Sequence, residues 1–128
     1  MNAHTRILQS PTPLGITMGC PAGIGPEIII KAFAANRKWL MIPPAVVIGD
    51  MNILKRASKA LDINISIKSW MPGDPFSNSA IYVITRTGLN IEDVPWGKPN
   101  SATGKASFEY ITEGIKLCQG KTGTSDQA

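Results

Sequence analysis

The sequence predicts an α/β protein in which a largely parallel sheet is covered by helices. Short apolar runs alternate with segments of helical periodicity, and Pro/Gly-rich turns separate them. Hydrophobic residues make up 43% of the 128 residues and charged residues 17%, which is typical of one folded domain. The net charge of +4 is modest, and no basic run is interleaved with aromatic residues. This pattern does not favour nucleic-acid binding.

The first elements follow a polar N-terminal stretch. We expect residues 1–13 to form a flexible arm and residues 14–120 to form the α/β domain. The short apolar run Leu14–Met18 predicts a buried strand. A Gly/Pro-rich turn follows it, and Glu27–Ala35 then reads as a helix that is apolar on nearly every side, so we expect it to be heavily buried.

The middle of the chain predicts a strand, a helix and a second strand. Ala45–Ile48 is a buried strand, and Asp50 is placed to cap the following helix. The apolar face of that helix is expected to hold Leu54, Ala57 and Leu61. Residues Ile63–Lys68 alternate between apolar and polar side chains, which predicts a strand with one solvated face near the edge of the sheet.

The last third predicts one more strand and one more helix. Met71–Ala80 reads as a loop, Ile81–Ile84 as a strand, and Thr85–Pro99 shows no clear periodicity. Ser101 is expected to cap a helix that runs to about Cys118. The apolar residues with helical spacing in this helix are Phe108, Ile111, Ile115 and Cys118.

The end of the chain differs in composition from the domain. Gly120 is a natural helix stop, and residues 121–128 have no apolar residue before the final alanine, so we expect a disordered tail. Neither Cys20 nor Cys118 belongs to a CxxC pair. Residues 1–13 lack the apolar core of a signal peptide, and no stretch has the length of a membrane span. A cytoplasmic location is therefore expected.

The most informative segment is Gly19-Cys20-Pro21-Ala22-Gly23-Ile24-Gly25-Pro26-Glu27, between the first strand and the first helix. Glycines let a ligand approach the main chain, and free amides at a helix start attract anions. The segment is neither GxGxxG, because Ile28 stands where a third glycine would, nor a Walker A loop. From spacing alone, a connecting turn and a ligand-binding turn both remain open.

The run Ile16–Glu27 closely resembles the opening signature of the 4-hydroxythreonine-4-phosphate dehydrogenase family, a strand followed by Gly-Asp-Pro-Ala-Gly-Ile-Gly-Pro-Glu. The resemblance continues through Val46–Asp50 and the helix after it. It covers about residues 14–120, and its later matching residues are Gly97, Lys98, Pro99, Gly104, Ala106, Tyr110 and Ile111.

The resemblance implies a three-layer α/β/α fold of the isocitrate/isopropylmalate dehydrogenase type and a homodimer. It also implies NAD and a divalent metal as cofactors, with Gly23, Ile24 and Gly25 forming part of the cofactor site. The implied reaction oxidises a phosphorylated four-carbon hydroxy acid, 4-phosphooxy-threonine in pyridoxal 5'-phosphate biosynthesis, and the product then decarboxylates. Two alternatives are a dehydrogenase for a sugar-acid phosphate, such as erythronate or threonate 4-phosphate, and a non-catalytic α/β binding module.

Two departures from the family pattern limit what this chain is expected to do. Cys20 stands where the family has an acidic residue. The family's metal-binding histidines and its substrate-binding His-Thr pair follow later in the chain, whereas His4 is the only histidine here. The resemblance therefore implies a chain cut off after the first part of the fold, with no catalytic or metal-binding residues of its own and no activity alone.

Overall fold

The computed structural model describes residues 13–35, 44–77 and 80–120. The expected tail and all of the expected arm except Pro13 lie outside these residues. The elements, in chain order, are β1 (Leu14–Thr17), α2 (Gly25–Ala35), β2 (Ala45–Gly49), α3 (Met51–Ala60), β3 (Ser66–Ser69), β4 (Ala80–Thr85), the 3-10 turn η1 (Ile91–Asp93) and α4 (Ser101–Cys118).

The four strands form one sheet in the order β1-β2-β4-β3, and every neighbouring pair is parallel. Leu14 lies opposite Ala45, and Val46 lies opposite Tyr82. Parallel neighbours need long crossover connections, and helices α2 and α3 lie within two of them. The predicted parallel α/β architecture is confirmed.

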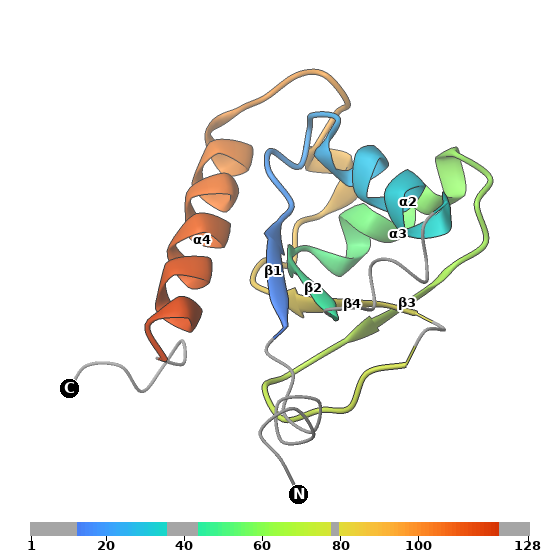
Figure 1. Ribbon diagram of the computed structural model, residues 1–128. Helices are drawn as coiled ribbons and strands as arrows, with labels where there is room; N and C mark the ends of the chain where they lie inside the picture. The colour runs from blue at the N-terminus through green and yellow to red at the C-terminus, as the bar shows by residue number, and fades with distance from the viewer. Residues whose placement is uncertain (1–12, 36–43, 78–79, 121–128) are drawn as a thin grey trace, which may run out of the picture.

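Helices cover the sheet on both sides (Figure 1). Helices α2 and α3 pack against each other on one side, while α4 packs over β1 and β2 on the other. Gly114 marks the close approach of α4, because an added Cβ would lie 3.5 Å from Ile48 Cδ1 and 3.6 Å from Thr17 Cγ2. The layers are therefore α/β/α, as the family resemblance implies.

Strand β1 forms an edge of the sheet, so the prediction of a buried first strand is wrong. Leu14 is 55% exposed, and β1 pairs only with β2 within the described sheet. The buried residue of this run is Met18, which follows the strand and donates its amide to the carbonyl of Ile48 at 2.9 Å. Apolar character indicated a strand, but it did not indicate how many neighbours the strand has.

Helix α2 begins at Gly25, two residues before the predicted start at Glu27. It buries Ile29, Ile30 and Phe33. Ile28, however, is 54% exposed, so the expectation of a helix that is buried on nearly every side is too strong.

The second helical unit follows the prediction closely. Asp50 caps α3 by accepting hydrogen bonds from the amides of Asn52 and Ile53. The predicted strand over residues 63–68 is observed as the shorter edge strand β3, which begins at Ser66. Its position at an edge agrees with the alternation of apolar and polar side chains.

Helix α4 begins at Ser101, but its cap is Asn100, not Ser101. The Asn100 side chain accepts from the Thr103 amide, and the Thr103 hydroxyl accepts from the Asn100 amide, which forms a capping box. A capping box pairs two backbone donors that the helix leaves without partners. The helix ends at Cys118 as predicted.

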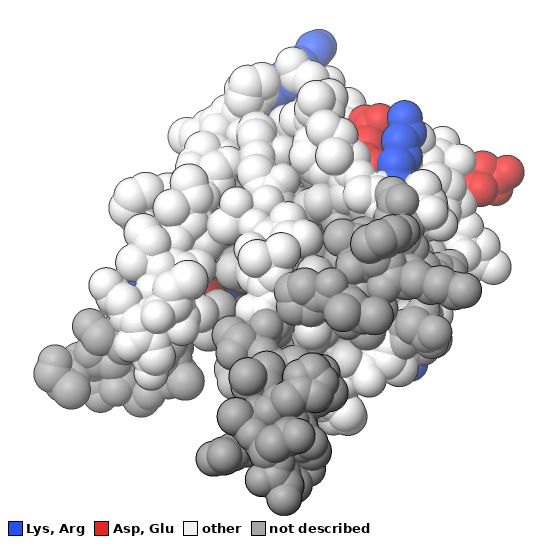
Figure 2. Space-filling model, viewed as in Figure 1, with Lys and Arg blue, Asp and Glu red and all other residues white. Residues whose placement is uncertain are grey.

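The predicted apolar stripe of α4 faces solvent. Phe108 is 70% exposed, and Ile111 and Ile115 are each 54% exposed. The face that packs on the sheet contains Thr103, Ala106, Tyr110 and Glu113. Figure 2 shows a face on which few charged side chains lie over the described residues. The apolar residues with helical spacing therefore form the solvent-facing side of α4, an orientation that their spacing alone did not indicate.

Candidate functional site: the glycine turn at the carboxyl edge of the sheet

The glycine turn, residues 19–25, is tight because the backbone folds back onto the end of β1. Gly19 has φ +80°, a conformation that side chains disfavour. The Gly23 amide donates to the Cys20 carbonyl at 2.9 Å. An added Cβ on Gly25 would lie 2.1 Å from the Met18 carbonyl oxygen. Gly25 is therefore required by packing, whatever the turn binds.

The three residues predicted to contact a cofactor lie together at the tip of the turn. Ile24 is 69% exposed, while Gly23 and Gly25 are partly exposed. The Gly23 amide is already engaged within the turn, so it is not a free donor for a ligand. Gly23 has room to spare, because an added Cβ would meet only the Cys20 carbonyl oxygen and Cβ, at 3.5 and 3.6 Å. The cofactor role of these residues stays a prediction.

The turn lies at the carboxyl edge of the parallel sheet. Strands β1, β2 and β4 end at Thr17, Gly49 and Thr85, and parallel strands end at the same edge. The Arg86 amide donates to the Gly49 carbonyl at 2.9 Å, which ties the segment after β4 to the end of β2. Ligands of open α/β sheets bind outside this edge, so the topology places the glycine turn where a ligand is expected.

A buried carboxylate organises the segments behind the turn. Asp50 is fully buried, and its Oδ2 accepts from the Thr87 hydroxyl and the Leu89 amide, each at 2.8 Å. Its Oδ1 accepts from the amides of Asn52 at 2.8 Å and Ile53 at 3.3 Å. Burial of a charge is costly unless hydrogen bonds replace its hydration, and four donors do so here. The sequence indicated the cap but not the two distant partners.

Tyr110 extends this network from α4. Its hydroxyl lies 2.6 Å from the Thr87 hydroxyl, and because Thr87 donates to Asp50, Tyr110 donates to Thr87. Burial of the side chain raises the pKa of Tyr110 to about 12. The phenol is therefore a neutral donor at physiological pH, and it holds α4 against the junction of β2 and α3.

A second polar pair joins the same segments. Arg86 Nε lies 3.5 Å from Glu113 Oε1, and the Glu113 side chain is 6% exposed. Sequence periodicity gave no sign of Thr87, Arg86 or Glu113, because their partners lie far away in the chain. Tyr110 was identified only as a residue shared with the family. Cys20, at the position where the family has an acidic residue, is a free and partly buried cysteine.

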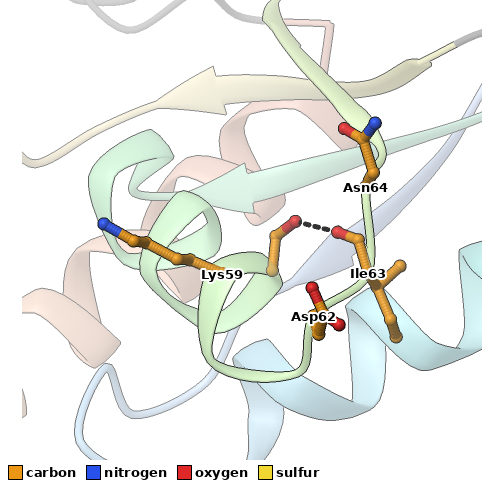
Figure 3. A pocket seen from close by; sticks show the side chains of 5 residues that line it. Lys59, Asp62, Ile63 and Asn64 are labelled. Atoms are coloured by element: carbon orange, nitrogen blue, oxygen red, sulfur yellow. Dashed lines mark hydrogen bonds between the residues drawn. The ribbon is translucent and has the colours of Figure 1, made fainter.

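A shallow pocket of 290 Å³ lies elsewhere, around the end of α3 (Figure 3). Its lining includes Lys59, Asp62 and Asn64, and the Ser58 hydroxyl donates to the Ile63 carbonyl there. Helix α3 starts after β2 and ends before β3, so this pocket lies toward the amino edge of the sheet. It is therefore at the opposite end of the sheet from the glycine turn.

The described residues do not gather a metal site: nowhere in them do three His, Cys, Asp or Glu side chains lie close enough together to hold an ion. A divalent metal beside the turn would need ligands from beyond these residues. In the same part of the chain, no helix has the length and apolar character needed to cross a membrane.

Comparison with known proteins finds relatives that match most of this chain in sequence and in fold. A protein of Oceanobacillus iheyensis assigned as a D-threonate 4-phosphate dehydrogenase is 39% identical over 106 residues, which are 81% of this chain and 32% of the relative. The 4-hydroxythreonine-4-phosphate dehydrogenase structure from Burkholderia phymatum matches with a TM-score of 0.74 at 28% identity, over 87% of this chain and 34% of that one. A structure from Salmonella typhimurium assigned to the same enzyme gives 0.73 at 30% identity, over 87% and 35%.

No protein-family model matches the chain. The chain spans about a third of the length of the curated relatives it matches. The parallel sheet and its α/β/α layers are consistent with these matches. So is the position of the glycine turn at the carboxyl edge. Over the matched residues, the chain is similar in sequence and fold to proteins named as 4-hydroxythreonine-4-phosphate and D-threonate 4-phosphate dehydrogenases.

Proposed function

We propose that this chain forms one wall of the NAD site in a dehydrogenase that oxidises a phosphorylated four-carbon hydroxy acid. The observation that carries the proposal is the position of the glycine turn, at the carboxyl edge of the sheet and at the start of an 11-residue helix. The names of the relatives support a dehydrogenase. NAD supplies the hydride acceptor when it is bound.

The turn and the helix start suit an anionic, extended ligand. The N-terminus of α2 carries the positive end of the helix dipole, which favours the phosphates of a dinucleotide. Gly25 packs against the Met18 carbonyl. We therefore expect the ligand to contact Gly23 and the exposed Ile24. At Gly23 the absence of a side chain leaves the main chain open to close approach.

The names of the relatives point to two candidate substrates of the same chemical class. The solved structures are named for 4-hydroxythreonine 4-phosphate, which favours 4-phosphooxy-threonine and a role in pyridoxal 5'-phosphate biosynthesis. The curated relatives are named for D-threonate 4-phosphate, which favours a sugar-acid phosphate instead. Each is a four-carbon hydroxy acid with a terminal phosphate. The non-catalytic binding module, which keeps the turn but supports no turnover, is the contrasting function.

The complete reaction needs groups that the described residues do not gather. Oxidation of an alcohol requires an acceptor for its proton and, as the family resemblance implies, a polarising metal. We propose that these groups and the rest of the substrate cleft come from outside the described residues, and that a homodimer partner completes the enzyme. We therefore expect no turnover by these 128 residues with NAD and a divalent metal, and a cytoplasmic setting for the complete enzyme.

Calorimetric titration with NAD tests the proposal, with Gly23→Ala as the informative variant. The added methyl makes only ordinary contacts within the turn, so the fold is expected to persist. The methyl would nevertheless stand where the ligand approaches, and we expect Kd to rise about tenfold or more. Gly104→Ala is the matched control, because its Cβ on α4 meets nothing within 4 Å. Equal affinity of wild type and Gly23→Ala, or no NAD binding by wild type, would contradict the proposal.

A further inference from the structure

Arg56 on α3 carries a charge that no carboxylate pairs with among the described residues. Its Nη1 donates to the Val94 carbonyl at 2.6 Å and, at 3.4 Å, to that of Ile91. Its Nε and Nη2 are buried and have no hydrogen-bond partner. Burial lowers the pKa of Arg56. A partly desolvated cation without a counter-charge is costly, which distinguishes Arg56 from an ordinary surface arginine.

Trp96 lies directly against this cation. The Arg56 Cζ atom is 4.1 Å from the centre of the Trp96 ring, in the geometry of a cation–π contact. The Trp96 residue remains 43% exposed. The guanidinium therefore backs the ring and fixes its orientation, while much of the indole stays open to solvent.

The segment that holds Trp96 is fastened to the glycine turn. The Gly97 amide donates to the Ala22 carbonyl at 2.7 Å, and Ala22 directly precedes Gly23. On its other side the segment is anchored by Val94, which is fully buried. An exposed aromatic ring with a positive charge behind it thus lies next to the turn at the carboxyl edge of the sheet.

We propose that Trp96, backed by Arg56, is a stacking surface for an aromatic ring of the nucleotide whose phosphates approach the glycine turn. An aromatic face binds a nucleobase by stacking. Arg56 has no salt-bridge partner among the described residues, so its positive charge remains available to attract the phosphates. The inference rests on the proposed NAD site and adds the residue that contacts a ring of the ligand.

If Arg56 and Trp96 had only a structural role, replacement of Trp96 would change the stability of the protein but not its affinity for the nucleotide. In that case Arg56 would serve only to hold the Val94 and Ile91 carbonyls. If the ring stacks on the ligand, affinity for NAD and AMP falls, while affinity for inorganic phosphate, which has no ring, does not.

The experiment is calorimetric titration of wild type and Trp96→Ala with NAD, AMP and inorganic phosphate, with circular dichroism and urea unfolding as controls for folding. We expect Kd for NAD and AMP to rise about 5- to 150-fold in Trp96→Ala, the range for loss of one stacking contact. Equal NAD affinity in both proteins overturns the stacking role and leaves the proposed function standing. Failure of wild type to bind NAD overturns both.

Trp96→Phe supplies a second readout that does not require Trp96→Ala to fold. Trp39, the third tryptophan of the chain, lies outside the described residues, so the comparison is made in a Trp39→Phe background. In that background NAD is expected to quench tryptophan emission, since Trp70 is only 7% exposed and Trp96 is open to the ligand. In Trp96→Phe the quenching should be lost, while calorimetry still detects binding because a ring remains. Quenching of equal size in both proteins would contradict the assignment.

Discussion

Replacement of Gly25 by alanine tests whether the glycine turn has the described geometry. The new Cβ would lie 2.1 Å from the Met18 carbonyl oxygen, about 1.3 Å short of ordinary contact. Met18 cannot easily move away, because it is 1% exposed and its amide is hydrogen-bonded to Ile48 at 2.9 Å. Overpacking of a rigid site costs about 1–3 kcal/mol, and contact with backbone places this case at the upper end.

A loss of about 3 kcal/mol lowers Tm by on the order of 10–20 °C in a domain of this size. Thermal unfolding followed by circular dichroism measures the change. Gly23→Ala is the control, because its Cβ makes contacts of 3.5 Å or more and should leave Tm nearly unchanged. Equal Tm values for Gly25→Ala and Gly23→Ala would refute the packing of α2 on the end of β1.

Three further predictions concern other parts of the fold. The raised pKa of Tyr110, about 12 against an ordinary value near 10, means that the folded state favours the neutral phenol, so its stabilising effect is present below pH 10 and lost as pH rises toward 12. Urea unfolding should show a loss on the order of 2 kcal/mol over that range in wild type and a smaller loss in Tyr110→Phe; equal losses would contradict the burial of this hydroxyl. Asp62 has φ 56°, so Asp62→Gly should raise the free energy of unfolding by about 0.5–1 kcal/mol, and a decrease would argue against the left-handed turn. Phe108 is 70% exposed, so Phe108→Lys should leave stability within about 0.5 kcal/mol while it reduces concentration-dependent association in light scattering; a large loss of stability would mean that Phe108 is buried.

The strand and helix pattern was predictable because each element carries a local signal. The five buried residues of β2 form a continuous apolar run, and Asp50 has the side chain of a helix cap at the expected place. The glycine turn was predictable for the same reason, since its residues are consecutive. Local physics therefore located the candidate site and the elements on either side of it.

The errors arose where long-range packing decides the outcome. Periodicity grouped Phe108, Ile111 and Ile115 on one face of α4, but it could not show that the opposite face, with Tyr110 and Glu113, lies on the sheet. The burial of polar residues there depends on partners in other segments, Thr87 and Arg86. The spacing of residues along the sequence does not show contacts between segments that are far apart in the chain.

Residue-resolved NMR during a titration with NAD tests most directly whether a nucleotide binds at the glycine turn. We expect the amide signals of Gly23 and Ile24 to shift with a common Kd, together with that of Gly97, whose amide donates to the Ala22 carbonyl. The signals of residues 58–64, around the pocket at the end of α3, should remain unchanged. Shifts confined to residues 58–64, or no shifts at the glycine turn, would show that NAD does not bind at the turn.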